Sequence, residues 1–197
     1  WTQIRKIRIW FICVHLCLSV VNLVFLGDAV PISSERIAGD IRAIAAITQT
    51  PGEGATRPTF SAEWRRACDY VAGQAEKIGC ACRVDAHGNW HIRQRSAGWE
   101  KRVWLSGSHL DTVPHGGDYD GVAGVIAPLE VLRSAADEKR DVPLEIIIFA
   151  EEEGPTFGVG MLGSRSWVGD ISVHQLGELR NKSVQSYLEA GAPHGVV

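Results

Sequence analysis

One histidine and several carboxylates lie in two short segments of the chain. Residues 107–113 contain His109 and Asp111, residues 151–154 contain three consecutive glutamates, and Asp120 lies between the two segments. An imidazole nitrogen and carboxylate oxygens suit zinc, manganese, cobalt or nickel better than they suit a soft, thiol-seeking ion. The residue types therefore predict a site for divalent metal ions.

The spacing of these groups suggests how they could act together. His109 and Asp111 are separated by one residue, so on an extended chain they point to the same side, and the aspartate could hold the second ring N–H of the imidazole. Asp120 begins a predicted helix beside a glycine, where its carboxylate can face the same crevice. At the end of a strand, the side chains of Glu152 and Glu153 can lie on two sides of one metal ion. One of them would bind the ion and the other would take a proton from water.

Both segments follow short apolar runs that are typical of strands. These runs are residues 103–105 and 144–149, and the second is almost uninterrupted, as in the buried strands of a parallel sheet. The helix that starts at Asp120 has apolar residues at helical spacing, namely Val122, Val125, Ile126, Leu129 and Leu132. We therefore predict an α/β fold with a mixed, mainly parallel sheet flanked by helices. Open α/β sheets bind their ligands where buried strands end, so the polar groups should share one crevice.

The preceding part of the chain predicts two helices and a strand pair. The helices should begin at capping serines, Ser33 and Ser61. Residues 82–85 and 89–92 indicate two strands joined by a turn. Two histidines near this turn, His87 and His91, are expected to face solvent.

The full set of motifs resembles that of one enzyme family. It resembles the two-metal amidohydrolases that include allantoate amidohydrolase, N-carbamoyl-L-amino-acid hydrolase, ureidoglycolate amidohydrolase and β-alanine synthase, within the zinc peptidase and aminoacylase superfamily. The resemblance runs from about Ile32 to the last residue. It rests on four motifs: Gly107-Ser108-His109-Leu110-Asp111-Thr112-Val113, Gly116-Gly117-Asp118-Tyr119-Asp120-Gly121, Glu151-Glu152-Glu153-Gly154 and Gly163-Ser164-Arg165.

The resemblance implies a role for each candidate residue. His109 would bind one metal ion, Glu153 the other, and Asp120 would bridge both. Glu152 would be the general base, and Asp111 would orient His109. The implied cofactors are two divalent metal ions, zinc or manganese, with cobalt and nickel as alternatives. The implied fold is a zinc-dependent exopeptidase-like catalytic domain.

Two features depart from the family pattern. Pro155-Thr156-Phe157 stands where the family usually has a small residue, an arginine and a phenylalanine, so the support of that loop needs another explanation. The family also uses two further histidine ligands, one of them in a His-Ile-Glu-Gln-Gly-like segment, and the chain has no such segment. A substitute ligand from His174 or His194 is a remote alternative.

The implied activity is hydrolysis of a ureido or carbamoyl carbon–nitrogen bond in a small linear amide, such as allantoate or an N-carbamoyl-L-amino acid. The first alternative is a metallopeptidase or aminoacylase of the same superfamily that cleaves an ordinary amide. The second is a non-catalytic fragment that binds metal weakly, because two histidine ligands are missing from its motifs.

Two parts of the chain differ in composition. In residues 1–31, three basic residues precede an apolar run at residues 9–26, which indicates a signal-like segment, a membrane anchor or a non-native extension. Residues 32–197 are expected to form the N-terminal part of the metal-binding catalytic domain. The resemblance implies that a lid-like dimerisation domain follows, so a homodimer is expected for the full-length protein.

Charge and cysteine content narrow the class of protein further. A net charge of −3 with no long basic run gives no basis for binding nucleic acid. The five cysteines form no Cys-x-x-Cys pair, which argues against a disulfide framework and favours a reducing compartment. We therefore expect a cytoplasmic protein without membrane contact, with secretion or membrane anchoring through residues 9–26 as the alternative.

Overall fold

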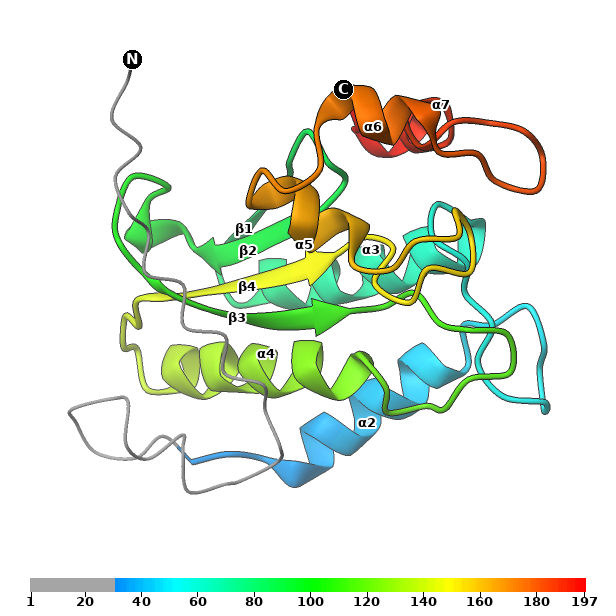
Figure 1. The fold of residues 1–197 in the computed structure, drawn as a ribbon. Coiled ribbons are helices and arrows are strands. Elements are labelled where there is room, and N and C mark those ends of the chain that lie inside the picture. Colours follow the sequence, from blue (N-terminus) through cyan, green and yellow to red (C-terminus); the bar gives the residue numbers. More distant parts are fainter. Residues whose placement is uncertain (1–30) are drawn as a thin grey trace, which may run out of the picture.

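The computed structural model describes residues 31–197, so the apolar run at residues 9–26 lies outside the described part of the chain (Figure 1). The sheet is formed by β1 (Cys80–Val84), β2 (Trp90–Gln94), β3 (Trp104–His109) and β4 (Leu144–Phe149). The helices are α2 (Ser34–Ala45), α3 (Ala62–Lys77), α4 (Val122–Asp137), α5 (Leu162–Trp167), α6 (Val173–Glu178) and α7 (Tyr187–Gly191), with short 3-10 turns η1 (Arg95–Ala97) and η2 (Ala192–His194).

The four strands form a mixed sheet in the order β1-β2-β4-β3. β3 and β4 are parallel, in a register that runs from Trp104 opposite Leu144 to His109 opposite Phe149. The pairs β1–β2 and β2–β4 are antiparallel. The predicted mixed sheet flanked by helices is confirmed, but within residues 31–197 the sheet is mainly antiparallel and not mainly parallel as predicted. Parallel pairing within residues 31–197 is confined to β3 and β4, because β1 and β2 are joined by a tight turn and only the α4 crossover returns the chain in the same direction.

The main core lies between the sheet and three helices on one of its faces. α3 packs against β1, while α4 packs against β3 and β4 and is crossed by α2 (Figure 1). The predicted caps are confirmed, because the side chain of Ser33 accepts a hydrogen bond from Arg36 N and that of Ser61 accepts one from Trp64 N. α5 lies on the opposite face of the sheet. No helix among residues 31–197 is long and apolar enough to cross a membrane.

α4 is buried on more than its predicted apolar side. The five apolar residues of the predicted face are fully buried, and so is Glu130 on another side of the helix. Arg36 of α2 reaches Glu130 at 2.7 Å, and Arg133 of α4 pairs with Asp40 of α2. α2 thus covers a polar strip of α4 through ion pairs, which an apolar periodicity cannot reveal.

The expected burial of the two parallel strands is confirmed for β4 and wrong for β3. Five of the six residues of β4 are buried. In β3, by contrast, Trp104 is 54% exposed and Leu105 is 37% exposed. The reason is topological, since β3 is an edge strand that pairs on one side only within the described residues.

The expectation that His91 faces solvent is also wrong. Its side chain is only 2% exposed, with Nδ1 at 2.6 Å from Glu145 Oε1 and Nε2 at 3.1 Å from Asp85 Oδ2. β2 is an interior strand, and the ring of Trp167 from α5 lies 6.2 Å from the His91 ring. The turn-based prediction failed because it placed the hairpin at the surface, whereas β4 and α5 cover His91 on β2.

Candidate metal centre

His109 is the last residue of β3, and its imidazole is held in one orientation. Nδ1 lies 2.9 Å from the main-chain oxygen of Asp111. A carbonyl oxygen can only accept a hydrogen bond, so Nδ1 carries the proton and Nε2 keeps a free lone pair. Gly121 packs against this imidazole, because a Cβ built there would lie 2.6 Å from His109 Cε1. Only glycine therefore lets the start of α4 approach the histidine so closely.

Three carboxylates converge on the free side of His109. Nε2 lies 3.5 Å from Glu152 Oε2 and 3.8 Å from Asp120 Oδ1. His109, Glu152 and Glu153 each offer a ligand atom within 4.8 Å of the others. The side chain of Asp120 is 69% exposed and that of Glu152 is 36% exposed, so the cluster is open to solvent on one side. An imidazole and carboxylates this close together form a donor set for a hard or borderline divalent cation.

The parallel pairing explains why these groups meet. His109 ends β3 opposite Phe149 of β4, and Glu152 and Glu153 follow β4 a few residues later. Asp120 comes back to the same end of the sheet just before α4 begins. The candidate ligands therefore lie together at the carboxyl ends of the two parallel strands, the position at which open α/β sheets bind their ligands.

Asp111 acts differently from the expectation. The sequence predicts that its carboxylate holds the second ring nitrogen of His109, but the main-chain oxygen of Asp111 does so, and the carboxylate Oδ1 stays 3.8 Å from Nδ1. Its Oδ2 instead accepts a hydrogen bond from Glu153 N at 3.1 Å. The chain turns after β3, and this turn brings the backbone rather than the side chain of Asp111 to the imidazole.

The electrostatics of the cluster suit a bound cation. Asp111 is fully buried, and burial raises the pKa of its carboxyl group to about 6. Its Oδ1 has no hydrogen-bond partner among the described residues. Burial also raises the pKa of Glu153; His109 opposes that rise, and Asp120 and Glu152 add to it. Carboxylates that repel one another in a partly buried site are stabilised by divalent cations, so the residues present fit the predicted metal ions.

Glu151 does not belong to the acidic cluster, although it stands beside Glu152 in the sequence. It is fully buried with a φ of 52°, and its Oε1 accepts hydrogen bonds from Thr156 N and Phe157 N, each at 2.8 Å. The carboxylate therefore closes the loop after β4 from inside. These two hydrogen bonds support the loop in which the family usually has an arginine and this chain does not.

Asn89 is a site residue that the sequence did not single out. Its Oδ1 accepts a hydrogen bond from Ala150 N at 3.1 Å, and its Nδ2 donates to Gly163 O at 3.1 Å. It thus joins the turn between β1 and β2 to the start of the loop that carries Glu151, Glu152 and Glu153, called the glutamate loop below. An asparagine after a glycine is a common turn residue, so local sequence carried no signal of this longer-range role.

The other histidines considered as ligands lie elsewhere. His115, which is near the cluster in sequence, is exposed in a loop, with Nδ1 at 2.9 Å from Glu53 O. His194 stacks on Phe60 with ring centroids 5.4 Å apart, and His174 is exposed on α6. Within residues 31–197, the side chains grouped closely enough to hold a metal ion are those of His109, Glu152 and Glu153, and none of these histidines joins them.

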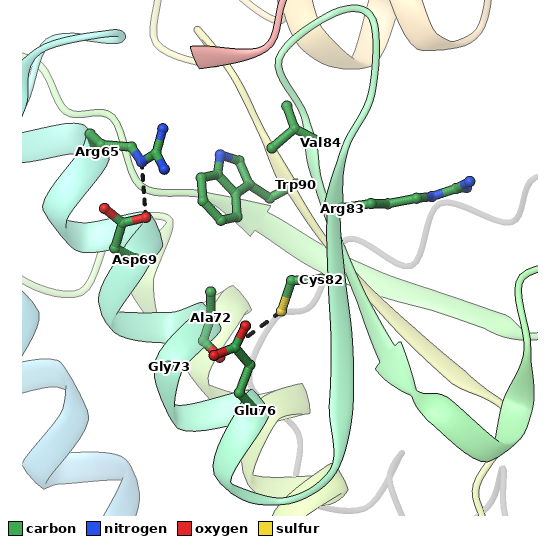
Figure 2. A pocket seen from close by; sticks show the side chains of 9 residues that line it. All are labelled: Arg65, Asp69, Ala72, Gly73, Glu76, Cys82, Arg83, Val84 and Trp90. Carbon is green, nitrogen blue, oxygen red and sulfur yellow. Dashed lines mark hydrogen bonds and ion pairs between the residues drawn. The ribbon is translucent and has the colours of Figure 1, made fainter. Parts of the chain in front are cut away.

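A groove elsewhere on the surface is separate from this cluster. It lies between α3 and the strands β1 and β2, and none of the candidate metal ligands lines it (Figure 2). Arg65 lies over the Trp90 ring at 5.2 Å and pairs with Asp69 at 2.9 Å. Its positive charge is therefore paired with a carboxylate of the same groove.

Comparison with known proteins gives consistent results. The family described as Peptidase family M28 matches residues 90–190. An N-carbamoyl-L-amino acid amidohydrolase of Geobacillus stearothermophilus is 36% identical over 161 residues, which cover 81% of this chain and 39% of that protein. An allantoate amidohydrolase of Bacillus subtilis is 34% identical over 133 residues, covering 66% of this chain and 32% of that protein.

Among solved structures, a hydantoinase/carbamoylase family amidase from Burkholderia ambifaria superimposes with a TM-score of 0.79 and 34% sequence identity. The match covers 85% of this chain and 42% of that one. The chain thus spans about one third to two fifths of the length of these relatives.

Proposed function

The chain belongs to peptidase family M28, and on that premise we propose that it carries metal ligands of a hydrolase for ureido or carbamoyl carbon–nitrogen bonds. The substrate class would be small linear amides such as allantoate or N-carbamoyl-L-amino acids, in line with the names of the relatives. The observation that carries the proposal is the convergence of His109, Glu152 and Glu153 within 4.8 Å at the open end of the parallel strand pair.

The proposed metal ligands are His109, Asp120 and Glu153. His109 presents Nε2, and Asp120 lies 3.8 Å from it and next to Glu153, which supports Asp120 as the residue between the two ions. Zinc or manganese fits this donor set, with cobalt and nickel as alternatives. When bound, such ions polarise a carbonyl group and make water more acidic.

Glu152 is the proposed general base. Its carboxylate is half-exposed and 3.5 Å from His109 Nε2, so it borders both the ligand cluster and the solvent. From there it can accept a proton from the attacking water and deliver that proton to the leaving nitrogen. Glu153 is similarly close to His109, and the division of roles between the two glutamates rests on the family resemblance. Asp111 holds the backbone of Glu153 and so keeps the pair in place.

A cytoplasmic location is part of the proposal, because Cys68, Cys80 and Cys82, the cysteines among the described residues, are free thiols. A homodimer is proposed for the full-length protein from the family resemblance, and light scattering of the full-length protein tests it.

A second candidate is favoured by the family description itself. A family described as peptidases supports cleavage of an ordinary amide, as in a metallopeptidase or aminoacylase. The two candidates share the same metal ligands and differ in the group on the carbonyl side of the scissile bond. The choice between them is therefore a matter of substrate.

The experiment uses the full-length protein, stripped of metal and then reloaded with zinc or manganese. Release of ammonia or amino acid is measured with allantoate, an N-carbamoyl-L-amino acid, the matching N-acetyl amino acid and a dipeptide. Turnover of a ureido or carbamoyl compound that requires metal supports the first candidate. Turnover confined to acetyl or peptide compounds supports the second candidate, and turnover that ignores metal removal overturns both.

A further inference from the structure

The two segments that carry the candidate metal ligands extend beyond the last residue pair of the β3–β4 ladder. The ladder between β3 and β4 ends where His109 faces Phe149. Asp111, Glu152 and Glu153 all lie beyond it, in irregular chain. Something other than strand pairing must therefore keep the two segments in place, and residues 55–59 contact both of them.

Residues 55–57 pair with the segment that follows His109. Arg57 N donates a hydrogen bond to Thr112 Oγ1 at 2.9 Å, and Thr112 N donates to Arg57 O at 3.2 Å. Thr112 Oγ1 in turn donates to Ala55 O at 3.0 Å. These bonds fasten the chain just after Asp111 through main-chain and hydroxyl groups that are buried from water.

The side chain of Arg57 holds the peptide between His109 and Asp111. It is fully buried, and its Nε donates to Leu110 O at 2.9 Å. Its Nη1 donates to Ile44 O at 3.2 Å and to Ile47 O at 3.0 Å, at the C-terminal end of α2. The guanidinium thus links a helix end, which carries a partial negative charge, to the metal-ligand segment.

This arginine is unusual because it is a buried cation without an ion-pair partner. No carboxylate lies within ion-pair distance of Arg57 among the described residues, and the guanidinium donates to carbonyl oxygens instead. Burial lowers its pKa, and the more distant Asp118 and Asp111 partly oppose this. Burying a charge in this way costs free energy, so a stabilised core alone is a poor explanation for its presence.

Thr59 makes the corresponding contact to the other ligand segment. It is buried, and its Oγ1 accepts a hydrogen bond from Glu151 N at 3.1 Å. Glu151 has a left-handed backbone conformation and directly precedes Glu152. The bond therefore fixes the residue at which the chain turns into the glutamate pair.

We propose that Arg57 and Thr59 are positioning residues of the metal centre, which hold the His109 segment and the glutamate loop at a set separation. The proposal rests on the proposed function, since it assumes that His109 and Glu153 bind metal. Neither residue touches the cluster. They act through Leu110 O and Glu151 N.

The test compares three variants with a matched control in the full-length protein. Arg57→Lys keeps the charge and loses the fork that reaches three carbonyls, and Thr59→Val removes one hydroxyl at nearly equal volume. Thr59→Ser keeps the hydroxyl and should behave like the wild type. The control is Arg133→Lys, which alters another buried arginine that ties α4 to Asp40 of α2, away from both ligand segments.

Metal affinity is measured by competition with a chromophoric chelator for zinc. We expect Arg57→Lys and Thr59→Val to bind zinc about 10 to 100 times more weakly, the effect usual for residues that orient metal ligands. Arg133→Lys should lower thermal stability and leave zinc affinity within about twofold. If Arg57→Lys fails to fold, the mild Thr59→Val still decides the question. Zinc affinity unchanged in Thr59→Val, or lowered as much by Arg133→Lys, overturns the proposal.

A second measurement separates this inference from the proposed function. Amide hydrogen exchange is recorded on metal-free protein at Thr112 and Glu151, whose N–H groups are bound to residues 57 and 59. We expect faster exchange at Thr112 in Arg57→Lys, at Glu151 in Thr59→Val, and at neither position in Arg133→Lys. Wild-type protein that binds no zinc overturns the proposed function, while the exchange data still decide whether Arg57 and Thr59 hold the two segments.

Discussion

The carboxylate of Asp111 accepts a hydrogen bond from the main-chain nitrogen of Glu153 at 3.1 Å, and this bond directly joins the two segments that carry the candidate metal ligands. One segment follows β3 and the other follows β4, and 42 positions separate the two residues in the sequence. The same aspartate holds His109 through its main-chain oxygen. Asp111 therefore sets the relative position of the histidine and the glutamates without occupying the open side of the cluster.

Replacing Asp111 by asparagine or by leucine separates the effect of its negative charge from that of this hydrogen bond. The Asp111→Asn side chain still offers an oxygen to Glu153 N but loses its negative charge, so we expect the fold to persist and zinc affinity to fall about 10- to 100-fold. Asp111→Leu should lower both zinc affinity and thermal stability, because Glu153 N then loses its acceptor. Calorimetric titration with zinc and a thermal melt of each variant give the two readouts. Zinc affinity unchanged in Asp111→Leu contradicts the coupling, because that variant removes the acceptor of Glu153 N.

The neighbouring glutamates give a second prediction. If Glu152 is the base and Glu153 a ligand, Glu152→Gln should lower kcat by about 10² to 10⁴ while metal content stays the same. Glu153→Gln should instead lose metal. Metal content by atomic emission and kcat at saturating metal separate the two effects, and each variant is the control for the other. Loss of metal in Glu152→Gln with retention in Glu153→Gln reverses the assignment.

The close approach of Gly163 to Asn89 predicts a steric effect. A Cβ at position 163 would lie 2.2 Å from Asn89 Oδ1 and 2.6 Å from Ala150 N. We expect Gly163→Ala to destabilise the protein by about 1 to 3 kcal/mol, as overpacking does, and to weaken metal binding as the glutamate loop shifts. Gly73→Ala is the control, because nothing lies within 4 Å of a Cβ there and α3 should gain stability. Urea unfolding of both variants measures the difference, and a Gly163→Ala variant as stable as Gly73→Ala refutes it.

Asp85 predicts a stability change in acid. Burial of its carboxyl group raises the pKa, but hydrogen bonds from His91, Asn89 and the backbone outweigh burial, so the pKa of Asp85 is lowered. A pKa that is lower in the folded than in the unfolded state stabilises the protein above the unfolded value, about 3.9, and this contribution is lost as the pH falls through the folded value.

Asp85→Asn should therefore be less stable than the wild type near neutral pH, and the difference should shrink below about pH 4. Urea unfolding at several pH values measures it. The matched control is Asp69→Asn, since that aspartate is half-exposed and pairs with Arg65 on the surface of α3. A stability difference for Asp85→Asn that stays constant down to pH 2.5 contradicts the prediction.

Features that depend on neighbours in the sequence could be predicted. Ser33 and Ser61 cap the predicted helices, and residues 144–149 form the predicted buried strand. A helix cap depends on residues only three positions apart, and a buried strand appears as a continuous apolar run. Neighbouring residues are therefore sufficient to predict both features. The candidate ligands His109, Asp120 and Glu153 also follow from their motifs, and the fold brings them to one end of the sheet.

Features that depend on contacts between distant segments could not be predicted. The burial of His91 arises from Glu145 and α5, the burial of Glu151 outside the ligand cluster from the amides of the loop after it, and the exposure of β3 from its place at the sheet edge. Arg57 reaches Leu110 across 53 positions of sequence. Periodicity indicates which side chains form an apolar face, and motifs indicate which side chains can bind a metal ion. The burial and hydrogen bonds of a polar side chain depend on which segments pack around it, and that packing is formed only when the whole chain folds.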